Sequence, residues 1–330
     1  MKNKLEIISE IGSVHDGSIG NAKKLIDLSK SCGATTVKFQ IHNAEDETLI
    51  SAPSPAYFNE ESRFEYFKRT SFTKFQWREL IKYAGNKKID FMVSPFSIKS
   101  FKILEEIGCK KIKIPSGEVN NYVLLEYIAK SKKKIYLSSG MSNWKELDEA
   151  INIFKNNDLT IMQCTSIYPC PNNMVGLNII SELKKKYNHN IGFSDHTEGY
   201  AAAIGAVIFG ATCVEKHLTF SRSMYGSDAL NAMEPNDFNL FCKNLNDIWK
   251  IYHNPVDKNN LNSLKKTKEV FEKSIVSNRR IEKGQEISLK NITFKKPGTG
   301  LKVNQLKGVI GLKLKKTIEK NTIIKKEDLK

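Results

Sequence analysis

The sequence predicts an α/β protein in which a (β/α)8 TIM barrel precedes a small, mostly-β domain. Short runs rich in β-branched residues alternate with amphipathic stretches through residue 252, and eight strand–helix units in about 250 residues are typical of this barrel. Dense turn signals beyond residue 268, such as Lys283-Gly284 and Pro297-Gly298, indicate a separate β module. A doubly wound open sheet is the alternative, although residues 10–17 lack the GxGxxG dinucleotide fingerprint.

Each expected element has its own signal in the sequence. The strands are short β-branched or aromatic runs, expected at residues 5–11, 35–42, 90–96, 111–116, 134–139, 160–166, 190–196 and 212–218. The helices are amphipathic stretches, expected at residues 21–31, 76–84, 121–131, 144–155 and 177–187. In the last of these, Ile180, Leu183 and Tyr187 recur at the spacing of one helix face.

Two stretches interrupt this alternation. Residues 43–72, which include Pro53 and Pro55, are too long for an ordinary strand–helix connection and indicate a lid or insertion. Residues 253–267 are rich in Asn and indicate a linker. We therefore expect a barrel domain at residues 1–252, a linker at 253–267 and a second domain at 268–330.

The composition is that of a folded protein with a basic C-terminal part. The chain has 330 residues, of which 40% are hydrophobic and 27% charged. Its net charge is +16, of which residues 251–330 contribute +12, from 20 Lys and Arg against 8 Asp and Glu. Because the sequence contains no standard nucleic-acid-binding motif, we interpret this charge as solvated surface and expect no nucleic-acid partner.

The sequence also bears on the cellular location. No apolar run reaches the ~18 residues that a membrane helix needs. The six cysteines include no CxxC pair, so we expect reduced thiols rather than a disulfide framework. The sequence therefore predicts a cytoplasmic protein that does not enter the membrane.

Polar residues follow every expected strand, at the end where TIM barrels carry their chemistry. Four of them are serines and two are lysines: Ser94, Ser116, Ser138, Ser194, Lys38 and Lys113. Short hydroxyl donors and fixed ammonium groups suit a phosphorylated, carboxylated anion, since charge-assisted hydrogen bonds are the strong ones. The alternative is that each serine caps the helix that follows it.

Two histidines end the last two expected strands. His196 and His217 would lie side by side in a mouth that also holds Glu10. Two imidazoles completed by carboxylate or water favour a labile divalent ion, Mn²⁺ or Mg²⁺, over structural zinc. We expect no metal role for the other four histidines.

A series of short motifs follows the strand ends in order along the whole chain. They are Ser9-Glu10-Ile11-Gly12, His15-Asp16-Gly17, Val37-Lys38-Phe39-Gln40, Ser94-Pro95-Phe96-Ser97, Lys113-Ile114-Pro115-Ser116-Gly117-Glu118, Leu137-Ser138-Ser139-Gly140, Cys164-Thr165-Ser166-Ile167-Tyr168-Pro169, Phe193-Ser194-Asp195-His196, Glu215-Lys216-His217 and Gly226-Ser227-Asp228. This set resembles the sialic acid (N-acetylneuraminate) synthase family. Residues 296–300 and Ile310-Gly311 resemble the family's C-terminal antifreeze-like (SAF, β-clip) domain.

The resemblance implies an enzyme that condenses phosphoenolpyruvate with an N-acetylated hexosamine. It implies that phosphoenolpyruvate binds to the six serines and lysines named above, that His196 and His217 hold the metal, and that Glu10 handles protons. The sugar-binding positions that it implies are Gln40, Tyr168, Asp228 and Lys296. In the family the antifreeze-like domain caps the partner subunit's barrel, so a domain-swapped homodimer is implied as well.

The sequence departs from the family pattern at positions that bear on the sugar. Lys296 stands where arginine is usual, and an ammonium group lacks the planar fork of a guanidinium. Ser166 and Val14 each stand where asparagine is common, and residues 54–69 lack the pattern of N-acetylmannosamine-specific members. We expect N-acetylneuraminate as the product. The alternative is the same reaction on a 2,4-diacetamido-2,4,6-trideoxyhexose, giving a legionaminic or pseudaminic acid. A non-catalytic barrel that binds an acidic partner is the hypothesis from a different class.

Overall fold

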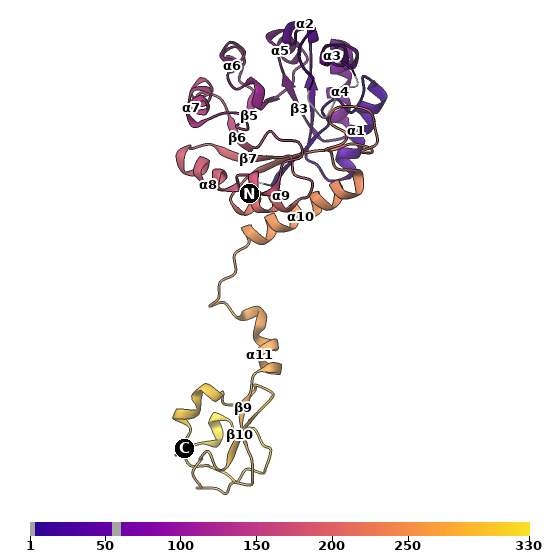
Figure 1. Ribbon diagram of the computed structural model, residues 1–330. Coiled ribbons are helices and arrows are strands. Elements are labelled where there is room, and N and C mark those ends of the chain that lie inside the picture. Colours follow the sequence, from indigo (N-terminus) through magenta and orange to yellow (C-terminus); the bar gives the residue numbers. More distant parts are fainter. Residues whose placement is uncertain (1–3, 55–60) are drawn as a thin grey trace. The chain divides into compact units, whose positions relative to one another are not determined.

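The computed structural model describes residues 4–54 and 61–330 of the chain. The chain divides into two compact units, Met1–Asn254 and Pro255–Lys330. In the first unit, eight parallel strands close into a barrel in chain order, with β1 paired to both β2 and β8 (Figure 1). The predicted TIM barrel is therefore confirmed, and the open-sheet alternative is wrong.

The barrel strands are short and lie close to the expected runs. They are β1 (Glu6–Glu10), β2 (Thr36–Ile41), β3 (Asp90–Pro95), β4 (Lys111–Ile114), β5 (Lys134–Ser138), β6 (Leu159–Cys164), β7 (Asn190–Asp195) and β8 (Cys213–His217). The register places Glu10 beside both Lys38 and His217. Three residues far apart in the sequence are thus neighbours at the carboxyl end of the barrel.

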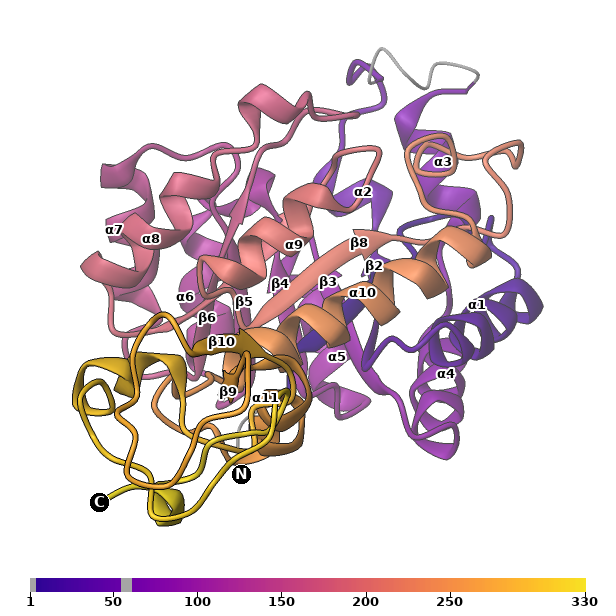
Figure 2. The same cartoon turned by 90° about the horizontal axis from the view of Figure 1, so that it is seen from below.

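Helices surround the barrel on its outer face (Figures 1 and 2). They are α1 (Ile19–Ser31), α4 (Lys74–Asn86), α5 (Ile98–Glu106), α6 (Tyr122–Ala129), α7 (Trp144–Ile153), α8 (Leu177–Lys186), α9 (Ala201–Ile208) and α10 (Pro235–His253). Side-chain caps begin several of them: Ser18 accepts from Asn21 in α1, Ser97 from Ser100 in α5, and Asn143 from Glu146 in α7. The long helix α10 packs against α9, and Figure 2 shows the two side by side.

The stretch predicted as a lid or insertion contains two short helices, α2 (Ala44–Glu47) and α3 (Arg63–Thr70). Ser62 caps α3 by accepting from the backbone of Glu65. Residues 55–60 of this stretch, including Pro55, lie outside the described residues.

Strand residues alternate between the barrel interior and the helical layer, which follows from the two-residue period of a strand. Ile7, Val37 and Phe39 belong to the main apolar core with the helices. Ile8, Met92, Tyr136, Met162 and Cys213 form a separate buried cluster. The same alternation makes Glu10, Lys38 and His217 face inward.

The second unit is a small module with its own core. Its regular elements are α11 (Lys265–Phe271), an antiparallel pair β9 (Ser274–Ser277) and β10 (Ile292–Lys295), and the 3-10 helices η3 (Asn262–Leu264), η4 (Val303–Gly308) and η5 (Lys326–Asp328). Isolated bridges, such as Val276 with Ile323 and Ile281 with Ile318, extend the β pairing. Ile275, Ile281 and Leu314 are among the buried residues that hold it together. The predicted small β domain is confirmed.

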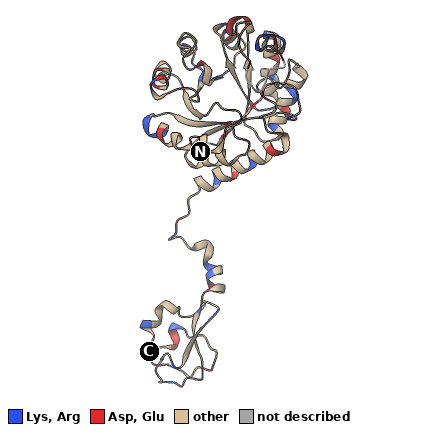
Figure 3. Ribbon diagram, in the orientation of Figure 1, with Lys and Arg blue, Asp and Glu red and all other residues tan. Residues whose placement is uncertain are grey.

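Charge is unevenly divided between the two units. Residues 255–330 carry 20 Lys and Arg against 8 Asp and Glu, a net charge of +12. Figure 3 shows Lys and Arg on α11 and on the module that follows it. Among the described residues, no helix is both long and apolar enough to cross a membrane.

Candidate active site

A cavity of about 730 Å³ opens at the carboxyl ends of the barrel strands. Its wall contains every predicted site residue of the barrel: Glu10, Lys38, Gln40, Ser94, Lys113, Ser116, Ser138, Tyr168, Ser194, His196, His217 and Asp228. Lys296 belongs to the second unit, where its side chain is exposed and its ammonium group lies 5.0 Å from the ring centroid of Phe271. The predicted capping role of Lys296 and the predicted homodimer stay predictions.

Two buried lysines and two buried carboxylates lie at the floor of the cavity. Lys38 Nζ is 2.6 Å from Glu10 Oε2 and 3.6 Å from Glu215 Oε1, and Lys113 Nζ is 2.8 Å from Glu215 Oε2. Burial opposes the charge of Lys38, but Glu10 and Glu215 outweigh it and raise the pKa of Lys38. Lys38 is thus held as a cation, and Lys113 lines the same cavity, where its Nζ atom can donate to an anion.

The sequence assigns no role to Glu215. In the structure, however, its carboxylate lies between the predicted residues Lys38 and Lys113. It is two positions before His217 in β8, so it faces the same interior. Burial raises its pKa, but Lys113 and Lys38 together lower it to about 2. Ser194 also donates to its Oε1 atom, over 3.2 Å. The two-residue alternation in Glu215-Lys216-His217 is the signal that could have identified it.

The pH dependence of stability follows from this carboxylate. A folded-state pKa of about 2, against 4.5 for an ordinary glutamate, means that the unfolded chain binds the proton first. The stabilisation is present above pH 4.5 and is lost as the pH falls toward 2. We expect the free energy of unfolding to drop by about 3 kcal/mol more in the wild type than in Glu215→Gln over this interval. Urea unfolding at several pH values checks this, and parallel curves for the two proteins would contradict it.

The four serines do not cap the helices that follow them. The helix after β3 is capped by Ser97, that after β4 and η1 (Ser116–Glu118) by Asn121, and that after β5 by Asn143, while α9, after β7, begins at Tyr200 without a side-chain cap. Within the described part of the chain, the buried Ser94 hydroxyl has no hydrogen-bond partner. The capping alternative is therefore wrong for this strand end, and the Ser94 hydroxyl is available to a ligand.

His196 and His217 lie beside Tyr168 in one wall. The two imidazole centroids are 5.9 Å apart, and the Tyr168 ring lies 4.2 Å from that of His196. His196 Nδ1 is 2.9 Å from the carbonyl oxygen of Thr165, and this contact fixes the orientation of the imidazole ring. Burial lowers the pKa of His217, which favours the neutral imidazole that metal binding requires. Burial also opposes the charge of His196, but the neighbouring Cys164 outweighs it and raises the pKa of His196.

These residues fit a labile divalent ion. The Nδ1 atom of His217 is buried and, among the described residues, has no hydrogen-bond partner. The described residues contain no group of three or more His, Cys, Asp or Glu side chains placed to hold a metal. A metal here would therefore take the two imidazoles as protein ligands and complete its shell with water or substrate oxygens, as Mn²⁺ and Mg²⁺ do.

Gln40 and Asp228 lie in another part of the cavity wall. Gln40 donates to Glu10 Oε1 over 2.6 Å, and its own oxygen lies 3.0 Å from His42 Nε2. Asp228 Oδ2 accepts from the backbone N–H of Ser13 over 3.0 Å. A Cβ atom on Gly12, whose φ is +54°, would lie 2.1 Å from Asp228 Oδ2. The close approach of the loop after β1 to the loop after β8 therefore requires glycine at position 12.

The model of the NeuB family matches residues 25–272, and that of the SAF domain matches residues 272–330.

The chain belongs to the NeuB family.

Relatives and a solved structure agree with this. The chain is 34% identical to the N,N'-diacetyllegionaminic acid synthase of Campylobacter jejuni, over 98% of this chain and all of that protein. It is 30% identical to the human N-acetylneuraminate-9-phosphate synthase, over 97% and 91%. The crystal structure of an N-acetylneuraminic acid (sialic acid) synthetase from Leptospira borgpetersenii, in complex with citrate, superposes with a TM-score of 0.70 at 30% identity, over 80% of this chain and 90% of that one. The resemblance to sialic acid synthases is confirmed, as is its SAF domain, and this NeuB-family chain is an enzyme of the synthase type.

Proposed function

We propose that this NeuB-family enzyme condenses phosphoenolpyruvate with an N-acetylated open-chain hexose to give a nonulosonic acid and phosphate. The observation that carries the proposal is that the buried lysines Lys38 and Lys113 line one cavity with Ser94, whose hydroxyl has no hydrogen-bond partner among the described residues. Fixed cations and hydroxyl donors at close quarters suit an anion that bears both phosphate and carboxylate. N-acetylmannosamine is the first candidate sugar, with N-acetylneuraminate as its product.

The diacetamido sugar is the second candidate. The relative from Campylobacter jejuni is named a diacetyllegionaminic acid synthase, and its similarity extends over nearly the whole of both chains. A 2,4-diacetamido-2,4,6-trideoxyhexose would react at the same aldehyde carbon. The two candidates therefore share one mechanism. They differ in the sugar substituents that the sugar-binding wall, made up of Gln40, Tyr168 and Asp228, would contact.

In this proposal the residues at the floor orient phosphoenolpyruvate. Lys38, Lys113 and the serines Ser94, Ser116, Ser138 and Ser194 bind its phosphate and carboxylate. Its methylene carbon forms the new C–C bond with the sugar aldehyde, water adds at the enol carbon that carried the phosphate, and phosphate leaves by C–O cleavage. A divalent ion on His196 and His217 would supply Lewis-acid polarisation of the aldehyde oxygen.

Glu10 is the proposed proton-handling group. Its carboxylate accepts from Gln40 and lies 2.6 Å from Lys38 Nζ, and only 1% of the residue is exposed. Held between an amide and an ammonium group, it is oriented toward the cavity and shielded from bulk water. It can move a proton between the reacting water and the sugar oxygen without a change of position.

Phosphate release tests the proposal. Purified enzyme with phosphoenolpyruvate and Mn²⁺ is given N-acetylmannosamine, 2,4-diacetamido-2,4,6-trideoxymannose or the corresponding altrose, with EDTA-treated enzyme as the control. We expect metal-dependent release with one of these sugars, and the sugar identifies the product. No release with any of them would favour the non-catalytic barrel instead.

Ser94 gives a sharper test of the anion site. Its hydroxyl is buried and has no hydrogen-bond partner in the part of the chain that the structure describes. Ser94→Ala is therefore expected to raise the KM for phosphoenolpyruvate about 10-fold or more, the effect of one hydrogen bond to a charged group. The KM for the sugar should change less than 2-fold. Steady-state kinetics with each substrate varied in turn provides the measurement.

Ser97→Ala is the matched control for this prediction. Ser97 follows the same strand but caps α5, so its loss should lower stability by about 1 kcal/mol and leave both KM values unchanged. A larger rise in the KM for the sugar than for phosphoenolpyruvate in Ser94→Ala would mean that the anion site is misplaced.

A further inference from the structure

We infer that α3 forms part of the sugar-binding wall through the hydroxyl of Tyr66, and that Arg69 is the positioning residue that holds α3 against two barrel loops. The inference rests on the proposed function and deepens it. It concerns residues of the predicted insertion that the motifs did not single out. The loops are the one after β1, which contains Ser13 and Asp16, and the one after β8, which contains Tyr225 and Asp228.

Tyr66 is a buried residue of the cavity wall. It is 1% exposed and lines the cavity wall together with Ser227 and Asp228. Its hydroxyl lies 3.5 Å from the carbonyl oxygen of Ser13 and hydrogen-bonds with Ser227. Burial, with Asp228 nearby, raises the pKa of Tyr66 to about 12, so the phenol is a neutral donor at physiological pH.

Arg69 fastens α3 to the loop after β1. Its Nη2 atom is 2.6 Å from Glu61 Oε1 and its Nε atom 3.0 Å from Glu61 Oε2, while Nη1 is 2.6 Å from Asp16 Oδ1. The two carboxylates thus occupy two sides of one planar guanidinium, an arrangement that lysine cannot reproduce. Asp16 has a φ of +50°, a left-handed conformation that a non-glycine residue adopts infrequently.

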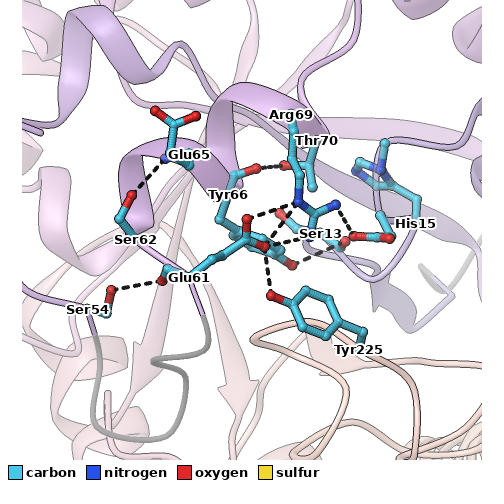
Figure 4. Close-up of polar contacts among 12 residues, drawn as sticks. Ser13, His15, Ser54, Glu61, Ser62, Glu65, Tyr66, Arg69, Thr70 and Tyr225 are labelled. Atoms are coloured by element: carbon cyan, nitrogen blue, oxygen red, sulfur yellow. Dashed lines mark hydrogen bonds and ion pairs between the residues drawn. The ribbon is translucent and has the colours of Figure 1, made fainter.

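The same guanidinium is tied to the loop after β8. The Arg69 guanidinium carbon lies 5.2 Å from the ring centroid of Tyr66 and 5.3 Å from that of Tyr225, and the Tyr225 hydroxyl is 2.8 Å from Glu61 Oε1. Figure 4 shows Arg69, Glu61, Tyr66 and Tyr225 gathered in one cluster. Arg69 therefore joins three segments that are distant in the sequence.

Glycines of the two loops approach α3 closely. A Cβ atom on Gly17, whose φ is +74°, would lie 2.8 Å from the carbonyl oxygen of Arg69. A Cβ atom on Gly226, whose φ is +128°, would lie 3.0 Å from the Tyr66 hydroxyl. Both loops thus approach α3 closely through glycine, so a displacement of α3 would change the position of Tyr66 relative to Asp228.

The chemistry of this corner suits a neutral polar group. Tyr66 donates, the Asp228 carboxylate accepts, and Ser227 does both. A hydroxyl or acetamido group of the sugar can pair with all three, whereas a phosphate would face the Asp228 carboxylate directly. The sugar end bound here is therefore a hydroxyl- or acetamido-bearing carbon rather than a phosphorylated one.

Steady-state kinetics of Arg69→Gln, Arg69→Lys and Tyr66→Phe tests the inference, with the sugar that the wild type accepts. We expect the KM for the sugar to rise about 10-fold in Arg69→Gln and about 5-fold in Tyr66→Phe, with Arg69→Lys between Arg69→Gln and the wild type. The KM for phosphoenolpyruvate should stay within about 2-fold in all three, since the lysine and serine floor is untouched. Lys68→Gln, which removes an exposed charge from the same helix, is the matched control and should behave as the wild type.

The outcomes separate the inference from the proposed function. No phosphate release by the wild type with any sugar would overturn both. Release by the wild type, with an unchanged sugar KM in Arg69→Gln and Tyr66→Phe, would overturn the inference alone. Equal rises in both KM values, or a loss of kcat that follows the thermal midpoint, would indicate a merely structural role and overturn it as well. If Arg69→Gln fails to fold, Asp16→Asn removes the negative charge that faces Arg69 Nη1 and is expected to raise the KM for the sugar in the same direction.

Discussion

Replacing His217 with alanine is expected to lower metal-dependent phosphate release by about 10³-fold. Lewis-acid stabilisation contributes several kcal/mol, and each ~1.4 kcal/mol corresponds to a factor of ten in rate. The fold should persist, because the buried Nδ1 atom of His217 has no hydrogen-bond partner among the described residues that the substitution would orphan. Mn²⁺ titration followed by electron paramagnetic resonance, beside phosphate release, provides the measurement. Bound Mn²⁺ should fall with the activity.

His189→Ala is the matched control. His189 directly precedes β7, whereas His196 directly follows it, so the two histidines belong to opposite ends of one strand. Loss of the imidazole at the amino end of the barrel should leave both Mn²⁺ binding and turnover unchanged. If His217→Ala kept wild-type activity and Mn²⁺ affinity, the metal assignment to this histidine would be wrong.

Replacing Glu215 with glutamine is expected to cost about 3–5 kcal/mol of stability at neutral pH. Glu215 lies 2.8 Å from Lys113 and 3.6 Å from Lys38, and its removal leaves a buried ammonium group without a counter-charge. For a domain of this size the thermal midpoint should fall by roughly 10 °C. Differential scanning calorimetry or urea unfolding provides the measurement.

The same variant connects stability to the anion site. If Lys38 and Lys113 bind the anionic substrate, inorganic phosphate or phosphoenolpyruvate should restore more stability to Glu215→Gln than it adds to the wild type. The double variant Glu215→Gln/Lys113→Met removes charge of both signs and should recover part of the loss. It also serves where the single variant does not fold. Equal stabilisation of both proteins by phosphate would mean that the two lysines do not bind anions.

The predictable part of the site comes from local patterns. The two-residue alternation in a strand makes Thr36, Lys38 and Gln40 share one face, and a closed parallel barrel brings every carboxyl strand end to one mouth. For this reason the sequence predicts that residues as distant as Glu10 and His217 share one cavity, whereas Asp228 is predicted only through the family resemblance. The motifs in turn pointed to the family, and the comparisons agree.

Other features depend on which side chains meet across the barrel. That Glu215 neutralises Lys113 rather than serving as a free acid follows from the stagger of β4 against β8, which no local pattern encodes. That Arg69 meets Asp16 and Tyr225 follows from the packing of α3 on two loops, 53 and 156 residues away in the sequence. Residue type and local spacing were therefore enough to predict the barrel, its mouth and the class of chemistry. Charge pairing and loop-to-loop contacts were decided by the tertiary structure, because their free energy comes from groups that only the folded chain brings within a few ångströms of each other.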